Sequence, residues 1–443
     1  MKIQLSDHFT YQRLLHFCLP SIVMMIFTSI YGVVDGLFVS NFVGKIPFAA
    51  INLVMPFIMI LGGFGFMIGT GGSALIAKTL GEGNHKLASR YFSMLIIMTV
   101  ILGLFLTTIG IVFARRVSIL LGATDVMLDD CVIYLRTVLL FISPFMLQNV
   151  FQSFLVTAQK PHAGLIVTII AGLTNMSLDA LFIVVFRWGV AGAALATGIS
   201  QCIGGLLPLI LFLGKNDSLL HLVPTRLEWS PFFLSCTNGM SELMGNISSS
   251  IVSMLYNFQL LNYAGENGIA AYGVLMYVQF IFIAVFFGYT IGVGPVIGYH
   301  YGAGNHAELK NLLRKSLKLN IITGISMTIL ANLFAGALSR IFVGYDPELY
   351  AMTKSAFHIF ALSFLVCGIN IFASAFFTAL NNGLVSAVIS FLRTLVFQVG
   401  SVLILPAFLG LTGIWLSNTF ADLMAMLISI IFLAAMRKRY HYA

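Results

Sequence analysis

The sequence predicts an all-α integral membrane protein whose twelve transmembrane helices form two parallel, pseudo-symmetric six-helix bundles. Composition is the first observation behind this prediction, because 59% of the 443 residues are hydrophobic and only 9% are charged, whereas a soluble domain carries about 25% charged residues. The mean hydropathy is +1.00. The second observation is a series of apolar runs of about 20 residues, each long enough to cross a bilayer as a helix. The third is that the second half of the chain repeats the first.

The apolar runs predict six spans in each half of the chain. Short polar loops separate them, and the period-2 alternation of a membrane β-barrel is absent from the sequence. The first six spans lie near residues 14–40, 48–76, 92–113, 131–157, 163–186 and 190–213. The next six lie near residues 235–263, 269–299, 319–338, 356–380, 384–405 and 412–436. Because six is an even number, both halves enter the membrane from the same side.

Basic residues indicate which side of the membrane the loops occupy. With the N-terminus inside, most of the 23 Lys and Arg residues, Lys2 and Lys215 among them, fall in cytoplasmic segments, which is the positive-inside distribution. We therefore expect a multi-pass protein of the inner (plasma) membrane with both termini in the cytoplasm. The formal charge of +8 is spread over many loops, so nucleic-acid binding is not expected.

Two glycine-rich loops reveal an internal duplication. GEGNH begins at Gly81 and GAGNH begins at Gly302, and we call the interval between these two glycines the repeat offset. The same offset, without a gap, superposes Asn149, Ser153 and Thr157 on Asn370, Ser374 and Thr378. The sequence thus predicts two lobes, residues 1–221 and 222–443, related by a pseudo-two-fold axis along the membrane normal. In transporters built this way, the substrate site lies between the repeats.

Four polar residues of the first half lie in spans and at similar depths. Asp35 is about five residues from the outer end of the first span, and Asp179 and Thr197 are about seven residues from the outer ends of the fifth and sixth. At 1.5 Å per residue, these positions lie roughly 8–11 Å below the outer surface. Asn175 precedes Asp179 by four residues and therefore shares its helix face. The four side chains are able to converge on one site.

Such a cluster offers two carboxylates, an amide oxygen and a hydroxyl. Hard oxygen donors suit a small hard cation. They also suit a proton, because two carboxylates in one dry site cannot both be ionised cheaply. The alternative is that the two acids only hold helices together. We favour the ion site, because interhelical polar bonds contribute about 0.6 kcal/mol on average, less than the cost of burying an acid in a membrane.

Charged residues also occur in spans of the second half. Glu242 and Arg393 fall in the inner or middle part of spans that leave the cytoplasm, so pairing with each other would lower their cost of burial. Asp422 is a further potential partner. The charged pair is equally compatible with a structural role and with lining the substrate path. Three uncharged residues in spans, candidates for a central cavity or for simple helix contacts, are Asn149, Gln152 and Asn370.

Signs of an enzyme, a metal site or a cofactor site are missing from the sequence. No nucleophile, base and acid form a recognisable arrangement, and the histidines lack metal-site spacing. GxGNH follows a helix and lacks the lysine of a phosphate-binding loop. The five cysteines have no CxxC spacing, which indicates reduced thiols. We expect neither catalysis nor a bound metal or cofactor.

The chain resembles the MATE family, the multidrug and toxic compound extrusion transporters, over essentially its whole length. Four features carry the resemblance: the duplicated six-span half, the GEGNH and GAGNH loops, the paired motifs GVAGAALATGIS and GLTGIWLSNTFAD, and NMSLD in the fifth span. Within that family, the chain resembles bacterial DinF-like and MepA-like members. The resemblance implies that Asp35, Asn175, Asp179 and Thr197 form the family's amino-terminal cation site.

The resemblance assigns roles to two further residues. Pro20 matches a first-span proline associated with helix bending in some members. Glu242 matches a seventh-span Glu that another branch uses together with a tenth-span Asp. Residues 356–380 contain no acid, so this chain departs from that branch's second cation site.

The implied function is antiport. Entry of H⁺ or Na⁺ through the amino-terminal lobe would drive the export of drug-like or cationic small molecules from a cavity between the lobes of a monomer in the lipid bilayer. A flippase for lipid-linked oligosaccharides, from the related superfamily, would need a cationic cavity and often two more spans. An ion channel is the alternative from a different class, and conductance without exchange of a second substrate would identify it.

Overall fold

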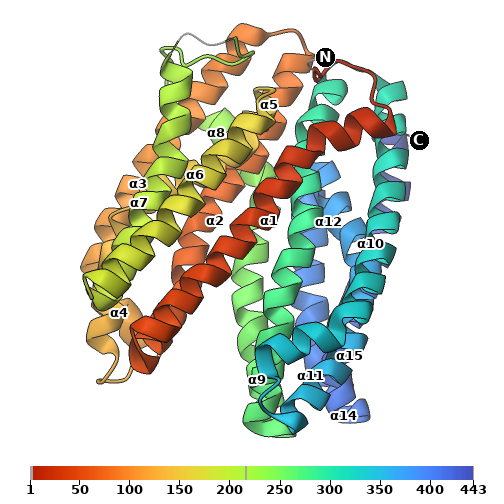
Figure 1. Cartoon of the computed structure of the whole chain (residues 1–443). Helices are drawn as coiled ribbons and strands as arrows, with labels where there is room; N and C mark the ends of the chain where they lie inside the picture. Colours follow the sequence, from red (N-terminus) through yellow and green to blue (C-terminus); the bar gives the residue numbers. More distant parts are fainter. Residues whose placement is uncertain (1–2, 215–216, 443) are drawn as a thin grey trace.

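The computed structural model describes residues 3–214 and 217–442, so Lys2 and Lys215 lie outside the described part. The first half is a bundle of seven α-helices with a π-helical turn after α6 (Figure 1). Its elements are α1 (Tyr11–Phe42), α2 (Lys45–Gly81), α3 (His85–Leu120), α4 (Leu128–Leu139), α5 (Ile142–Thr157), α6 (Pro161–Asp179), the π-helix η1 (Ala180–Val185) and α7 (Gly189–Leu213).

The second half is also helical throughout its described residues. A short helix, α8 (Trp229–Asn238), leads into the long helix α9 (Met240–Gly302). The remaining elements are α10 (His306–Val343), α11 (Pro347–Phe360), the 3-10 turn η2 (Ala361–Ser363), α12 (Phe364–Ala379), α13 (Gly383–Phe391), the π-helix η3 (Leu392–Phe397), α14 (Gln398–Leu409), α15 (Leu411–Ala435) and α16 (Arg437–Tyr440).

Helix α9 contains two of the predicted spans. Sixty-three residues would measure about 95 Å as one straight helix, about three times the thickness of the hydrocarbon core. Gly265 interrupts it with φ 62° and ψ −152°, a conformation that favours glycine. The rings of Tyr256 and Tyr272, on either side of Gly265, stack at 4.8 Å. Sixteen residues of straight helix would separate them by about 24 Å, so the chain folds back at Gly265.

The predicted span near residues 131–157 differs from expectation, because it is not one straight helix. It consists of α4 and α5, which meet at an angle of 56°. With this bent pair, the described residues contain up to eleven apolar helices long enough to cross a membrane. The fold-back in α9 supplies the twelfth span, so the number and order of predicted spans agree with the structure.

The structure repeats itself with the period seen in the sequence. Three pairs of glycines with positive φ are each separated by the repeat offset, and each lies between two helices or within a fold-back. These pairs are Gly44 and Gly265, Gly83 and Gly304, and Gly189 and Gly410. A positive φ strains any residue with a Cβ. The repeat therefore preserves turn conformation as well as helix order.

The two halves meet in a symmetric backbone contact. A Cβ placed on Gly81 would lie 2.0 Å from the carbonyl oxygen of Tyr299, and one on Gly302 would lie 2.0 Å from that of Lys78. The repeat offset carries Gly81 onto Gly302 and Lys78 onto Tyr299. Such reciprocity is the signature of an interface on a two-fold axis. The lobe boundary between positions 221 and 222 stays a prediction.

The hydrophobic core is shared at one end of the molecule and divided at the other. One buried cluster joins residues from both halves with segments near both termini, among them Phe17 and Leu309. The other two clusters draw on one half each, residues 39–194 and residues 252–415. The halves accordingly pack together at the end that carries both termini and diverge toward the opposite end (Figure 1).

The close contact at Gly81 yields a stability prediction. Gly81→Ala adds a methyl group where backbone already lies, and overpacking of this kind costs about 1–3 kcal/mol. We expect a lower unfolding temperature for purified Gly81→Ala protein in detergent. Gly294→Ala in α9 is the control, because a Cβ there meets nothing within 4 Å. Equal unfolding temperatures for the two variants would contradict the tight contact between the halves.

Candidate functional site

The structure places the four polar residues of the first half on neighbouring helices. Asp35 lies on α1, Asn175 and Asp179 lie in the last turns of α6, and Thr197 lies on α7. Helix α6 packs against both α1 and α7. Asp35 and Asp179 are close enough for their carboxyl groups to interact directly. The convergence expected from their depth in the spans is therefore present in the fold.

The oxygen atoms of this cluster are withdrawn from solvent and lack hydrogen-bond partners. Asp179 and Asn175 are 0% and 2% exposed. With both carboxyl groups ionised, five oxygens have no hydrogen-bond partner within the protein: Oδ1 of Asp35, Oδ1 of Asn175, Oδ1 and Oδ2 of Asp179, and Oγ1 of Thr197. Buried polar groups in folded proteins are nearly always hydrogen-bonded, so five unsatisfied oxygens in one place are an exception that needs an explanation. A bound cation or proton would satisfy them, and that role stays a prediction.

Two tyrosines belong to the same neighbourhood, and sequence reasoning missed them. Tyr134 of α4 is 2% exposed, and its hydroxyl lies near Thr197 and both carboxyls. Tyr31, one helical turn before Asp35, also lies near that acid. No spacing or motif in the sequence links Tyr134 of α4 to the residues on α1, α6 and α7. Only the fold shows that Tyr134 is part of the site.

A local irregularity marks the acid in α6. The regular helix ends at Asp179, and a π-helical turn occupies residues Ala180–Val185. Such turns are frequent at functional sites, because they alter the direction in which nearby side chains point. Nothing in the amino-acid pattern indicates this turn, since residues 180–185 simply continue the apolar part of the fifth span.

In the second half, two buried residues of opposite charge pair with each other. Arg393 donates from Nε to Oδ1 of Asp422 at 2.7 Å, with side chains 16% and 2% exposed. Asn370 donates to the Asp422 carbonyl oxygen at 2.8 Å and accepts from Ser429 at 3.2 Å. The suggested pairing of Arg393 with Glu242 is thus wrong, since the partner is Asp422. The physical reason is distance. The Arg393 guanidinium contacts the Asp422 carboxylate directly, whereas Glu242 lies close enough to Arg393 for a Coulombic interaction but not for an ion pair.

The remaining predicted cavity residues have different surroundings. Asn149 is 2% exposed and donates to the Gly62 carbonyl oxygen at 3.1 Å, which ties α5 to α2. Gln152 is 5% exposed, and its Oε1 has no partner. Glu242 is half-buried near the start of α9. Asn149 and Asn370 hold helices together within their halves, and contact of any of these residues with substrate stays a prediction.

Pro20, the proposed bending residue, is buried inside α1, which continues from Tyr11 to Phe42 without a break. Within the described ranges, no group of three or more His, Cys, Asp or Glu residues could hold a metal ion. A separate hollow of about 550 Å³ lies at the start of α3 and is lined by Lys86, Arg90 and His221 among others. Its basic lining does not suit a cation, and it is distinct from the acid cluster.

A comparison with protein families shows which family the chain belongs to. The MatE family model matches this chain twice, at residues 20–181 and at residues 243–404. The chain belongs to the MATE family. This MATE protein is 25% identical to the multidrug export protein MepA of Staphylococcus haemolyticus over 436 residues, which cover 97% of this chain and 94% of MepA. It is 23% identical to MepA of Staphylococcus aureus over 438 residues.

Solved MATE structures have the same fold. A crystal structure of MATE in complex with MaL6 superposes with a TM-score of 0.93 at 21% identity and covers 98% of both chains. A crystal structure of MATE in the straight conformation gives a TM-score of 0.92 at 21% identity. The protein is therefore a multi-pass transporter of the multidrug export family, and not an enzyme.

The buried ion pair of the second half of this MATE transporter gives a prediction about stability. Removing one partner leaves the other charge buried and uncompensated, which costs about 3–5 kcal/mol. We expect Arg393→Met and Asp422→Leu each to lower the unfolding temperature in detergent, and the double variant to recover most of the loss. If the double variant loses the sum of the two single effects, the pair is not coupled as its geometry indicates.

Proposed function

We propose that this transporter is a secondary antiporter that exports organic cations or amphipathic drugs in exchange for inward movement of H⁺ or Na⁺. The observation that carries the proposal is the cluster of five unpartnered oxygens on Asp35, Asn175, Asp179 and Thr197. In a low-dielectric surrounding, adjacent carboxylates strongly favour binding a proton or a cation. Asp35 and Asp179 are the coupling pair, and Asn175 and Thr197 are neutral oxygen ligands.

The same cluster can link ion binding to conformation. Each oxygen comes from one of three helices, α1, α6 and α7. With the ion bound, the helices are held together by its contacts. Without it, the carboxylates repel each other and favour an arrangement that admits water. A ligand that interacts differently with two conformations shifts the balance between them, which is the physical requirement for coupled exchange.

The proposed substrate path lies between the halves. The shared core at the end with the termini and the separate cores at the other end fit a transporter that alternates access by rocking one repeat against the other. We place the termini in the cytoplasm of a cell whose plasma membrane holds the protein as a monomer. The structure then represents the state that is open to the outside.

The substrate class follows from charge and from the relatives. Glu242 is an acid near the interface of the halves that has no ion-pair partner among the described residues, and it would attract an organic cation. Met and Phe side chains, 20 and 39 in this chain, provide a lining that adapts to varied apolar ligands. The relative named multidrug export protein MepA aligns with 97% of this chain and over 94% of its own length.

A flippase is the second candidate. It would require a cationic cavity for a lipid-linked phosphate, and the cation in the spans of the second half, Arg393, is neutralised by Asp422. A channel would conduct ions without moving a second substrate. Both alternatives are separable from antiport by the transport assay below.

We predict that Asp35→Asn and Asp179→Asn each abolish gradient-driven ethidium efflux. The substitutions preserve size and remove the charge that must change during coupling. The double variant should be little worse than either single one, since both acids form one unit. Efflux is measured in proteoliposomes with pH and Na⁺ gradients imposed separately.

Asp125→Asn is the matched control, because Asp125 is an exposed acid of the same half and should transport at the wild-type rate. Wild-type efflux and unchanged gradient dependence in both Asp35→Asn and Asp179→Asn would refute the coupling role. Ion conductance without ethidium movement in the unmodified protein would identify a channel instead.

A further inference from the structure

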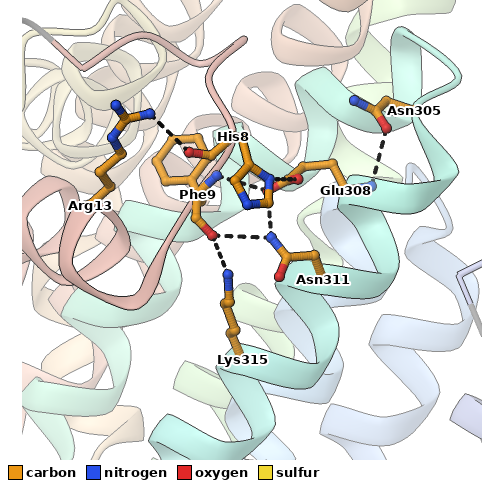
Figure 2. A network of polar contacts seen from close by, with 7 residues as sticks. All are labelled: His8, Phe9, Arg13, Asn305, Glu308, Asn311 and Lys315. Atoms are coloured by element: carbon orange, nitrogen blue, oxygen red, sulfur yellow. Dashed lines mark hydrogen bonds and ion pairs between the residues drawn. The ribbon is translucent and has the colours of Figure 1, made fainter.

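The segment that precedes α1 lies on the opposite half of the molecule. The contact between the segment and the second half centres on Glu308, an acid at the start of α10 that is only 5% exposed. One carboxylate oxygen accepts the backbone N–H of Phe9 at 2.9 Å, and the other contacts Nδ1 of His8 at 2.6 Å (Figure 2). Asn311 also donates to this carboxylate at 2.8 Å. The first half is thereby fastened to a buried acid of the second.

The same segment is fixed by a carbonyl and by apolar side chains. The carbonyl oxygen of Phe9 accepts from Nζ of Lys315 at 2.6 Å and from Asn311 at 3.1 Å (Figure 2). Leu5 and Phe9 are 0% exposed, and both belong to the core cluster that joins the halves. Undocking the segment would break charge-assisted bonds, which are about twice as strong as neutral ones, and would expose two large apolar side chains.

The linker between the halves makes the reciprocal contact. Ser89 and Ser93 of α3 accept from the backbone N–H groups of His221 and Val223, at 3.3 and 2.9 Å. Arg90 of α3 pairs with Glu228 at 3.3 Å. This linker leads into α8, the first helix of the second half. Thus the segment entering each half lies across the start of the third helix of the other half.

The repeat places the two contacts at equivalent helix starts. Helices α3 and α10 begin at His85 and His306, which the repeat offset superposes. Each segment precedes the first helix of its half, although the residues that make the contacts, His8 and Phe9 in one segment and His221 and Val223 in the other, are not related by the repeat offset. We call residues 3–10 the N-terminal strap and residues 217–228 the linker strap. Both cross the interface at the end where the halves share their core.

The polar contacts of the two straps differ in strength, while both straps bury apolar side chains, Leu5 and Phe9 in one and Leu220 in the other. The N-terminal strap is held by a buried carboxylate and by the ammonium of Lys315, whereas the linker strap is held by neutral hydroxyls and by an ion pair whose side chains are 44% and 45% exposed. Exposed ion pairs contribute about 0–1 kcal/mol. We propose that the N-terminal strap is a latch, which holds the halves closed at this end and must leave Glu308 before they can part there.

A distance measurement tests the latch. Spin labels at Lys86→Cys and Ala307→Cys, which are exposed and equivalent positions of the two halves, report the separation of the halves in a cysteine-free background. Glu308→Gln and Phe9→Ala should each raise the ratio of long to short distances about ten-fold, the ratio that corresponds to about 1.4 kcal/mol. Glu228→Gln, the matched change in the linker strap, should alter the ratio less than two-fold. Unchanged distances in both latch variants, or an equal shift in Glu228→Gln, would overturn the proposal.

A covalent bridge tests whether the strap must be released during transport. In the double variant His8→Cys and Glu308→Cys, a short bifunctional thiol reagent should abolish ethidium efflux, and each single-cysteine variant should be unaffected by it. Undiminished efflux after bridging would show that the strap need not release. This arm rests on the proposed export and the distance arm does not. If the protein with its natural His8 and Glu308 moves no ethidium under any gradient, the export is refuted, whereas activity that survives bridging refutes the latch alone.

Discussion

The hydrocarbon core of a membrane offers no hydrogen bonds, so every polar group placed there must be satisfied by the protein itself. This constraint explains most of the structure. Asn149, Asn370 and Asp422 lie deep in the helix bundles, and each is held by a neighbouring backbone or side chain. The acid cluster of the first half departs from the rule, because five of its oxygens have no partner. We interpret that departure as the space where the transported ion binds.

The two halves share a fold but differ in the charged residues that they bury. Tyr256 stands at the position that the repeat offset makes equivalent to Asp35, and residues 382–400, the equivalent of α6, include no acid. The second half instead pairs Arg393 with Asp422. One repeat therefore carries an unsatisfied anionic cluster and the other a neutralised pair. In the proposed mechanism, the two duplicated bundles rock against each other and only the first of them binds the ion.

Much of this architecture could be predicted because it depends on patterns that sequence displays directly. Spans appear as apolar runs, the repeat appears as GxGNH, and the one-turn spacing of Asn175 and Asp179 places them on one face. What could not be predicted depends on contacts between segments distant in sequence. Tyr134 reaches the acids only because α4 packs against α7. Arg393 pairs with Asp422, and not with Glu242, because α15 packs against the π-helix that carries Arg393. The docking of residues 3–10 on α10 is likewise invisible in a short polar stretch.

The central claim is that Asp35 and Asp179 together bind one exchangeable ion, and infrared difference spectroscopy tests it most directly. Protein in lipid would be compared between acidic and alkaline buffer, and with and without Na⁺. The account predicts a protonated carboxyl band that disappears on alkalinisation or on addition of Na⁺ and that is missing from both Asp35→Asn and Asp179→Asn. A spectrum in which no titrating carboxyl band depends on either residue would contradict it.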